Sequence, residues 1–129
     1  MRKLLLLALL LAASGPVLAH HQFASEFDAD KKVTLKGKIV KMAWVNPHAW
    51  LYIEVTDPAG KVVPWALEFG TTHSLTKRGW RKDDLPVGTM VTVEGFLAKN
   101  GSNTANANRV ILADGRALFA GSSFGDAEP

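Results

Sequence analysis

A strand–turn–strand pattern in the middle of the chain constrains the fold most. From Ala49 to Thr56, apolar residues alternate with polar or aromatic ones, which is the period of a β-strand with one buried face. The next four residues, 57–60, read Asp-Pro-Ala-Gly: Pro presets φ, Asp accepts backbone hydrogen bonds, and Gly tolerates positive φ. Residues 61–69 are again mostly apolar. The pattern therefore predicts a β-hairpin over residues 49–69.

The rest of the chain adds further strand-like segments. The other expected elements are a strand over 33–45, a short helix over 72–79, a strand over 89–98, a polar exposed loop over 99–108, and a hairpin of residues 109–112 and 116–119. Gly37 indicates a bend or bulge in the first strand. This order of elements is typical of the OB-fold, a small Greek-key barrel. We expect an all-β protein, a five- or six-stranded OB-like barrel with one short helix, and an open β-sandwich is the alternative.

The N-terminal segment has the three parts of a secretory signal peptide. Arg2 and Lys3 precede ten apolar residues, Leu4–Ala13, and a small-residue cleavage site ends at Ala19. The apolar run is shorter than the roughly 20 residues of a membrane-spanning helix, so no stable membrane anchor is expected after cleavage. The predicted organisation is a signal peptide (1–19), a mature N-terminal arm (20–32), an OB-like barrel domain (33–120) and a flexible tail (121–129). We expect a periplasmic or secreted bacterial protein.

Composition and the lack of catalytic motifs argue against several functions. The chain has no Cys, which excludes disulfides, thiolate metal sites and a cysteine nucleophile. Its formal charge is +3, but cleavage removes two basic residues and no acidic one, which leaves an excess of one positive charge. Nucleic-acid binding requires clustered positive charge, so no nucleic-acid partner is expected. No serine-hydrolase or phosphate-loop motif occurs, and an enzyme is not expected; Glu54 and Glu68 as an acid–base pair are the catalytic alternative.

Several short motifs together resemble a known family. The matching stretches include Ala19-His20-His21-Gln22-Phe23-Ala24, Trp44-Val45-Asn46-Pro47-His48, Arg78-Gly79-Trp80 and Asp114-Gly115-Arg116. On these residues the chain resembles an uncharacterised family of small exported bacterial proteins, known only as a domain of unknown function. Gln22 departs from the family pattern, in which Ser is expected. The resemblance covers nearly all of the mature chain and implies export and a small barrel, but it implies no activity.

Histidines are the candidate metal ligands, and none of the four belongs to a standard zinc motif. Signal cleavage makes His20 the first residue of the mature chain. A free N-terminal His offers its α-amine and imidazole to one ion, and a third nitrogen completes a site suited to copper. His48 is the preferred third ligand and His73 the reserve. The chain after His20 must fold back to the barrel, and Phe23 and Phe27 are expected to anchor that return. The alternative is a flexible terminus that binds metal only adventitiously.

Aromatic residues supply the second candidate binding surface. We expect Trp50, Tyr52, Trp65 and Trp80 to form a stacking platform for a flat or sugar-like ligand, although such residues also fill and cover small barrels. The histidines and the aromatic residues together predict a periplasmic binding module for a small ligand or a metal, with copper as the expected metal. The alternative function is a non-enzymatic accessory protein that docks another envelope protein through the aromatic face.

Overall fold

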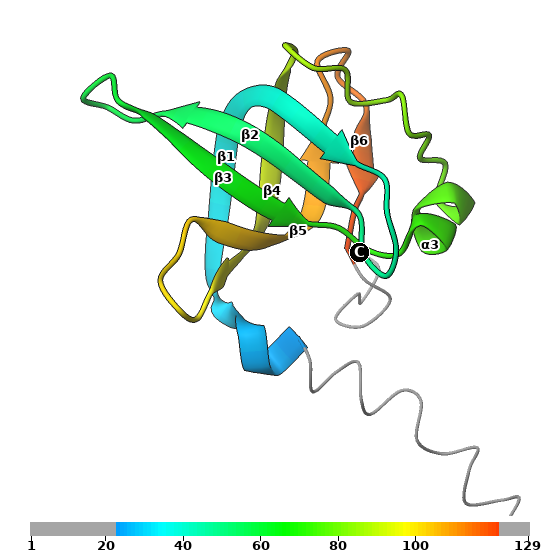
Figure 1. Cartoon of the computed structure of the whole chain (residues 1–129), viewed down its shortest axis with the longest axis horizontal. Helices are drawn as coiled ribbons and strands as arrows, with labels where there is room; N and C mark the ends of the chain where they lie inside the picture. Colours follow the sequence, from blue (N-terminus) through cyan, green and yellow to red (C-terminus); the bar gives the residue numbers. More distant parts are fainter. Residues whose placement is uncertain (1–22, 122–129) are drawn as a thin grey trace, which may run out of the picture.

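The computed structural model describes residues 23–121, in which a six-stranded sheet is accompanied by a short helix and an N-terminal helical turn. The strands are β1 (Phe27–Ala43), β2 (Trp50–Thr56), β3 (Val62–Glu68), β4 (Met90–Ala98), β5 (Thr104–Ile111) and β6 (Ala117–Phe119), and the helix is α3 (Thr72–Lys77). The strand β1 pairs antiparallel with both β2 and β4, and Lys38 lies where the two pairings meet. One long strand thus joins both halves of the sheet (Figure 1).

The sheet closes on itself. Its order is β3-β2-β1-β4-β5-β6, and an additional parallel pairing joins β3 to β5. That pairing sets Ala66, Leu67 and Glu68 opposite Thr104, Ala105 and Asn106. Together with the short helix between β3 and β4, it gives the topology of an OB-like barrel and excludes the open sandwich. The expected fold class is therefore confirmed.

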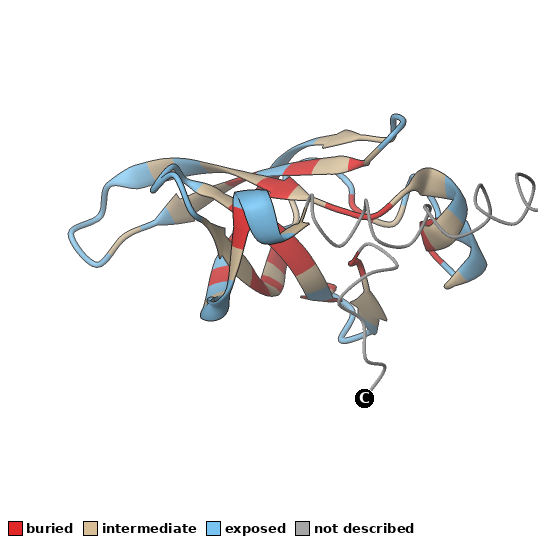
Figure 2. Cartoon of the chain, turned by 90° about the horizontal axis from the view of Figure 1, so that it is seen from below, coloured by how far each residue is buried: buried red, intermediate tan, exposed pale blue. Residues whose placement is uncertain are grey.

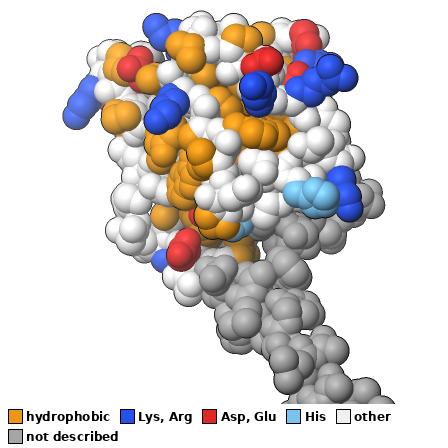
Figure 3. All heavy atoms as spheres, turned by 45° about the vertical axis from the view of Figure 1, so that its right-hand side comes forward, with side chains coloured by type: hydrophobic (Ala, Val, Ile, Leu, Met, Phe, Trp, Pro, Cys, Tyr) orange, Lys and Arg blue, Asp and Glu red, His pale blue; other side chains and the backbone are white. Residues whose placement is uncertain are grey.

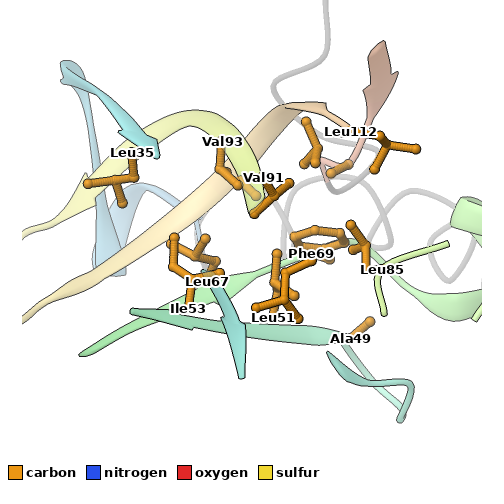
Figure 4. Close-up of a cluster of buried hydrophobic side chains, with 14 of the residues drawn as sticks. Leu35, Ala49, Leu51, Ile53, Leu67, Phe69, Leu85, Val91, Val93 and Leu112 are labelled. Carbon is orange, nitrogen blue, oxygen red and sulfur yellow. The ribbon is translucent and has the colours of Figure 1, made fainter. Parts of the chain in front are cut away.

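Strand alternation sends one set of apolar side chains into the barrel. Leu51 and Ile53 of β2 and Leu67 of β3 are buried, as the alternation of residues 49–56 predicts. They pack against Val91 and Val93 from β4 (Figure 4). Buried residues follow the barrel wall, whereas the ends of the hairpins are exposed (Figure 2). The interior is filled by side chains, so binding chemistry has to be sought on the outside and at the ends of the barrel.

The helix α3 is joined to the core of the barrel by one buried residue. Thr71 caps its N-terminus, because its hydroxyl accepts a hydrogen bond from the Ser74 N–H at 3.1 Å. Leu75 is the helix residue that is fully buried. The helix ends at Lys77, two residues before the predicted end, and Gly79 follows with a φ of 95°.

Three details of the sequence prediction are wrong. The first strand begins at Phe27 instead of residue 33, so part of the expected arm belongs to the barrel wall. The predicted loop over residues 99–108 contains the start of β5, where Ala105 and Ala107 are buried. The bulge in β1 lies at Val40, between Ile39 and Lys41, and not at Gly37, where a bend or a bulge was predicted. Gly37 has a different role, because it allows the close approach of β2: a Cβ there would lie 2.6 Å from a β2 carbonyl oxygen.

The predicted signal peptide, the first three residues of the arm and most of the tail lie outside the described residues. Within residues 23–121, no helix has the length and the apolar composition needed to cross a membrane. The described part of the chain starts with a helical turn at residues 23–26, which leads directly into β1.

Candidate functional site

Four strands bring one row of side chains together on the outer face of the barrel. In the sheet register, Phe96 of β4 pairs with Asn106 of β5, Asn106 with Glu68 of β3, and Glu68 with Trp50 of β2. Paired residues share a face of a sheet, and the adjacent Leu67 is fully buried in the barrel. The row therefore lies outside the barrel, with two polar side chains between two aromatic ones.

The two polar members of the row are largely shielded from solvent. The Glu68 side chain is 13% exposed, and Asn106 is 4% exposed. The Asn106 amide donates a hydrogen bond to Glu68 Oε1 at 3.4 Å. Burial raises the pKa of the Glu68 carboxyl, and the attraction of His48 opposes this rise while repulsion by Glu26 adds to it. The poorly solvated carboxyl group of Glu68 thus lies beside the imidazole of His48.

His48 joins this cluster from the segment that leads into β2. Its Nδ1 lies 2.9 Å from the carbonyl oxygen of Phe69, and a carbonyl only accepts, so Nδ1 carries the proton in the neutral ring. The same Nδ1 lies 3.8 Å from Glu68 Oε1. This tautomer leaves the lone pair of Nε2 available, as in metal-binding imidazoles whose other nitrogen is held by a carbonyl. The ring is 29% exposed and can be reached by a ligand.

The N-terminal turn is attached to the same side of the barrel. The Phe23 ring packs against Phe96, with the ring centroids 5.8 Å apart, and lies at the same distance from Phe27. The backbone N–H of Lys99 donates to the Glu26 carbonyl at 2.9 Å, and the Lys99 ammonium donates to the carbonyl of Ala24. Phe23 therefore lies over the end of the row that also contains Asn106 and Glu68. This is the aromatic anchoring expected for the returning arm.

The remaining predicted metal ligands lie in two places. His20 and His21 fall outside the described residues. His73 is exposed on α3, next to Thr72, whose hydroxyl donates to Asn46 Oδ1 at 3.0 Å. In residues 23–121, no three His, Asp or Glu side chains are grouped so that they could hold one metal ion. His48 can thus supply one ligand from the barrel, and any further ligands must come from elsewhere.

The predicted aromatic platform is divided over different parts of the barrel. Trp50 and Tyr52 share the outer face of β2, where Trp50 is half-buried and Tyr52 is 36% exposed. Trp65 pairs with Ile53 and therefore points to the opposite face of the hairpin. Trp80 is in the core, 1% exposed; its Nε1–H donates to the Phe119 carbonyl at 2.7 Å. The expectation of one surface formed by all four residues is corrected, because Trp80 is buried in the core and Trp65 starts from the other face of the hairpin, although Trp65 and Tyr52 both line the groove described next.

An open groove borders Tyr52 on this outer face. It has a volume of about 590 Å³ and is lined by residues of β1, β2, β3 and the loop before β5. The Lys41 ammonium lies 5.8 Å from the centroid of the Tyr52 ring. In Figure 3, hydrophobic side chains form patches on one face of the molecule, interrupted by basic and acidic ones. The groove combines an apolar surface with charged groups.

Sequence reasoning missed two members of the row, Phe96 and Asn106. Phe96 lay in a segment predicted as a strand, but nothing marked it as a contact for the N-terminal turn. Asn106 lay in the predicted loop. The local sequence gives no clear signal of a strand there, because the neighbours that are buried, Ala105 and Ala107, are small.

The comparisons with known proteins identify a family without a known activity. A family model described as a family of unknown function, DUF6152, matches residues 8–107. The chain belongs to the DUF6152 family. The resemblance found in the sequence is thereby confirmed at the level of a domain of unknown function. No curated protein matches the chain.

The comparison with solved structures gives two matches to this DUF6152 member. The mitochondrial single-stranded DNA binding protein Rim1 from S. cerevisiae has 13% sequence identity and a TM-score of 0.50, and the match covers 64% of this chain and 93% of that one. The N-terminal domain of PriB from Thermoanaerobacter tencongensis has 19% identity and a TM-score of 0.39, with 65% and 97% covered. At such identities, the first similarity supports the barrel fold alone.

Proposed function

We propose that this protein is an exported binding module for a small ligand or metal, and that the preferred metal is Cu(II). The mature chain would begin at His20 in the bacterial periplasm or outside the cell. The His20 α-amine and imidazole would bind the ion together with Nε2 of His48. The observation that carries this proposal is the fixed tautomer of His48, whose Nδ1 is held 2.9 Å from the Phe69 carbonyl oxygen.

The position of the N-terminal turn supports a meeting of His20 and His48. Phe23 packs on Phe96, and two strand spacings separate Phe96 from Glu68 in the row. Strands lie about 4.8 Å apart, so this separation is about 10 Å. The three residues from His20 to Phe23 span about 10 Å when extended. The Glu68 carboxylate near His48 adds negative charge that favours a bound cation.

Copper titration of four proteins tests this site. The first is authentic mature protein beginning at His20, and the second carries one extra N-terminal Met, which removes the chelating amine from the His. The third and fourth are His48→Ala and His73→Ala. We expect the extra Met and His48→Ala each to weaken Cu(II) binding by about tenfold or more, because each removes one nitrogen ligand, while His73→Ala has no effect.

The measurements are calorimetric Kd values and electron paramagnetic resonance of the bound Cu(II), which reports the number of nitrogen ligands. Binding should weaken as the pH falls, because the amine and the imidazoles must be deprotonated to bind the ion. If all four proteins bind copper equally, the defined site does not exist. If His73→Ala weakens binding and His48→Ala does not, the reserve ligand replaces the preferred one.

The second candidate function is docking of another envelope protein. Exposed apolar side chains favour it: Val40 is 43% exposed and Met90 45%, and they lie on adjoining strands, since Lys38 pairs with Met90. Chemical cross-linking in cells, followed by mass spectrometry, distinguishes the two functions. A single partner cross-linked near Val40, and lost on Val40→Asp, would support docking.

A further inference from the structure

The groove beside Tyr52 is lined by residues other than those of the His48 cluster. Its volume of about 590 Å³ lies within the range of about 300–1,000 Å³ that is usual for small-molecule sites. The residues that give it its chemistry are Val40, Lys41, Tyr52, Glu54, Pro64 and Asn103. None of them belongs to the proposed copper site, so the two sites are tested separately.

The floor of the groove is apolar and partly exposed. The bulge in β1 places Val40 at the surface, where it is 43% exposed. Tyr52 follows across the sheet, paired with Lys41 and 36% exposed. Pro64 of β3 lies on the same outer face, because it pairs with Glu54. A Tyr ring flanked by aliphatic groups suits a flat or ring-shaped ligand with an apolar face.

The polar groups around this floor define the rest of the ligand. Lys41 has no carboxylate within ion-pairing distance among the residues that the structure describes, so its charge is available to an anion. Glu54 adds hydrogen-bond acceptors and Asn103 adds both donors and acceptors. Hydroxyl groups need both kinds of partner. A ligand that carries an anionic group and several hydroxyl groups therefore pairs with more of the polar groups of the groove than a purely apolar molecule does.

From these contacts we infer that the groove binds a short acidic saccharide. A sugar ring stacks on Tyr52, its carboxylate pairs with the Lys41 ammonium, and its hydroxyls bond to Glu54 and Asn103. A single-stranded nucleic acid fits less well, although it also offers rings and negative charge. DNA carries no free hydroxyl groups along its backbone, so it leaves the hydrogen-bonding groups of Glu54 and Asn103 without partners.

The test uses the mature protein and three probes: tri-galacturonate, the neutral trisaccharide maltotriose, and a six-nucleotide oligo(dT). Amide chemical shifts in NMR titrations report both affinity and location. We expect tri-galacturonate to bind at least about tenfold more tightly than either other probe, with shifts confined to the groove. Tyr52→Ala and Lys41→Met should each weaken this binding by about tenfold, because each removes a stacking ring or a cation.

Lys61→Met is the matched control, since Lys61 is an exposed lysine outside the groove lining. It should bind tri-galacturonate like the unaltered chain. The unaltered pattern of amide signals in each variant shows that it is folded. Equal binding of maltotriose would overturn the role of Lys41, and tighter binding of oligo(dT) would overturn the ligand class. Absence of tri-galacturonate binding at millimolar concentration would overturn the inference as a whole.

Discussion

Among the glycines of the described residues, Gly95 is the one at which an added methyl group should lower the stability of the fold most. It is buried in β4 and pairs with Ala107 of β5. A Cβ at this position would lie 2.2 Å from the carbonyl oxygen of Asn106 and 3.2 Å from the Ala107 Cα, where ordinary contacts begin at 3.4 Å. Both neighbours are backbone atoms of the paired strand, so β4 and β5 must move apart. Overpacking of this kind costs about 1–3 kcal/mol, and weakened ladder hydrogen bonds add about 1 kcal/mol, so Gly95→Ala should destabilise the fold by about 3 kcal/mol.

The assay is unfolding in urea and by heat, and Gly101→Ala is the control. Gly101 has a φ of 77° but no heavy atom within 4 Å of its added Cβ, so only the backbone strain remains, about 1 kcal/mol. For a domain of this size, the loss at Gly95 should lower Tm by roughly 12 °C or more. If Gly95→Ala costs no more than Gly101→Ala, the close approach of the two strands is not as described.

Three further changes test the core, the buried carboxyl group and the N-terminal turn. Trp80→Phe removes the indole donor from the Phe119 carbonyl and should cost about 2–3 kcal/mol in urea unfolding, whereas a loss below about 0.5 kcal/mol would contradict a core role. Burial raises the pKa of Glu68, so its ionised form destabilises the folded chain; Glu68→Gln should raise Tm at neutral pH, and the difference should vanish in acid below the ordinary pKa of Glu. A constant difference at all pH values would refute this linkage. Phe23→Ala removes two aromatic contacts and should cost about 1 kcal/mol, while weakening Cu(II) binding by calorimetry; unchanged affinity would separate the turn from the metal site.

Local patterns made the hairpin and the barrel predictable. In residues 49–56 alternation alone marks the inner face, and the turn at 57–60 has side chains that favour reversal: Asp57 Oδ1 accepts hydrogen bonds from the backbone N–H groups of Ala59 and Lys61. The order of the predicted strands and the one helix then left few possible topologies, of which the OB-like barrel was one. The number and order of the strands could thus be predicted because alternation and turn residues are local patterns in the sequence.

The start of β5 could not be recognised in this way. Residues 104–108 consist of Thr, Ala and Asn, a composition typical of loops, and no large apolar side chain marks an inner face. The strand is held by partners far away in the sequence: Gly95 leaves room for its backbone, and β3 pairs alongside it. The close approach of the strands favours small residues in β5, and because these residues are small, the sequence resembles that of a loop.

The candidate site was predicted only in part. His48 was identified from its place between two strands, and Phe23 from the need to anchor a returning arm. The neighbours of His48 could not be predicted, because the row that joins Glu68 to Asn106 depends on the parallel register of β3 and β5. The sequence carries no local signal for a pairing between residues 38 positions apart. The same limit applies to Trp80, since its burial depends on the position of β6.

The short pairing between β3 and β5, the seam of the barrel, determines how easily the barrel opens locally. Only three residue pairs join these strands, whereas seven pairs join β2 to β3. Opening this short seam breaks far fewer contacts than unfolding the sheet, so it belongs to the motions of lowest free energy. Glu68 and Asn106 form its last pair. The buried carboxyl group therefore gains access to water each time the barrel opens, and a ligand that bridges β3 and β5 at this place would hold the barrel shut.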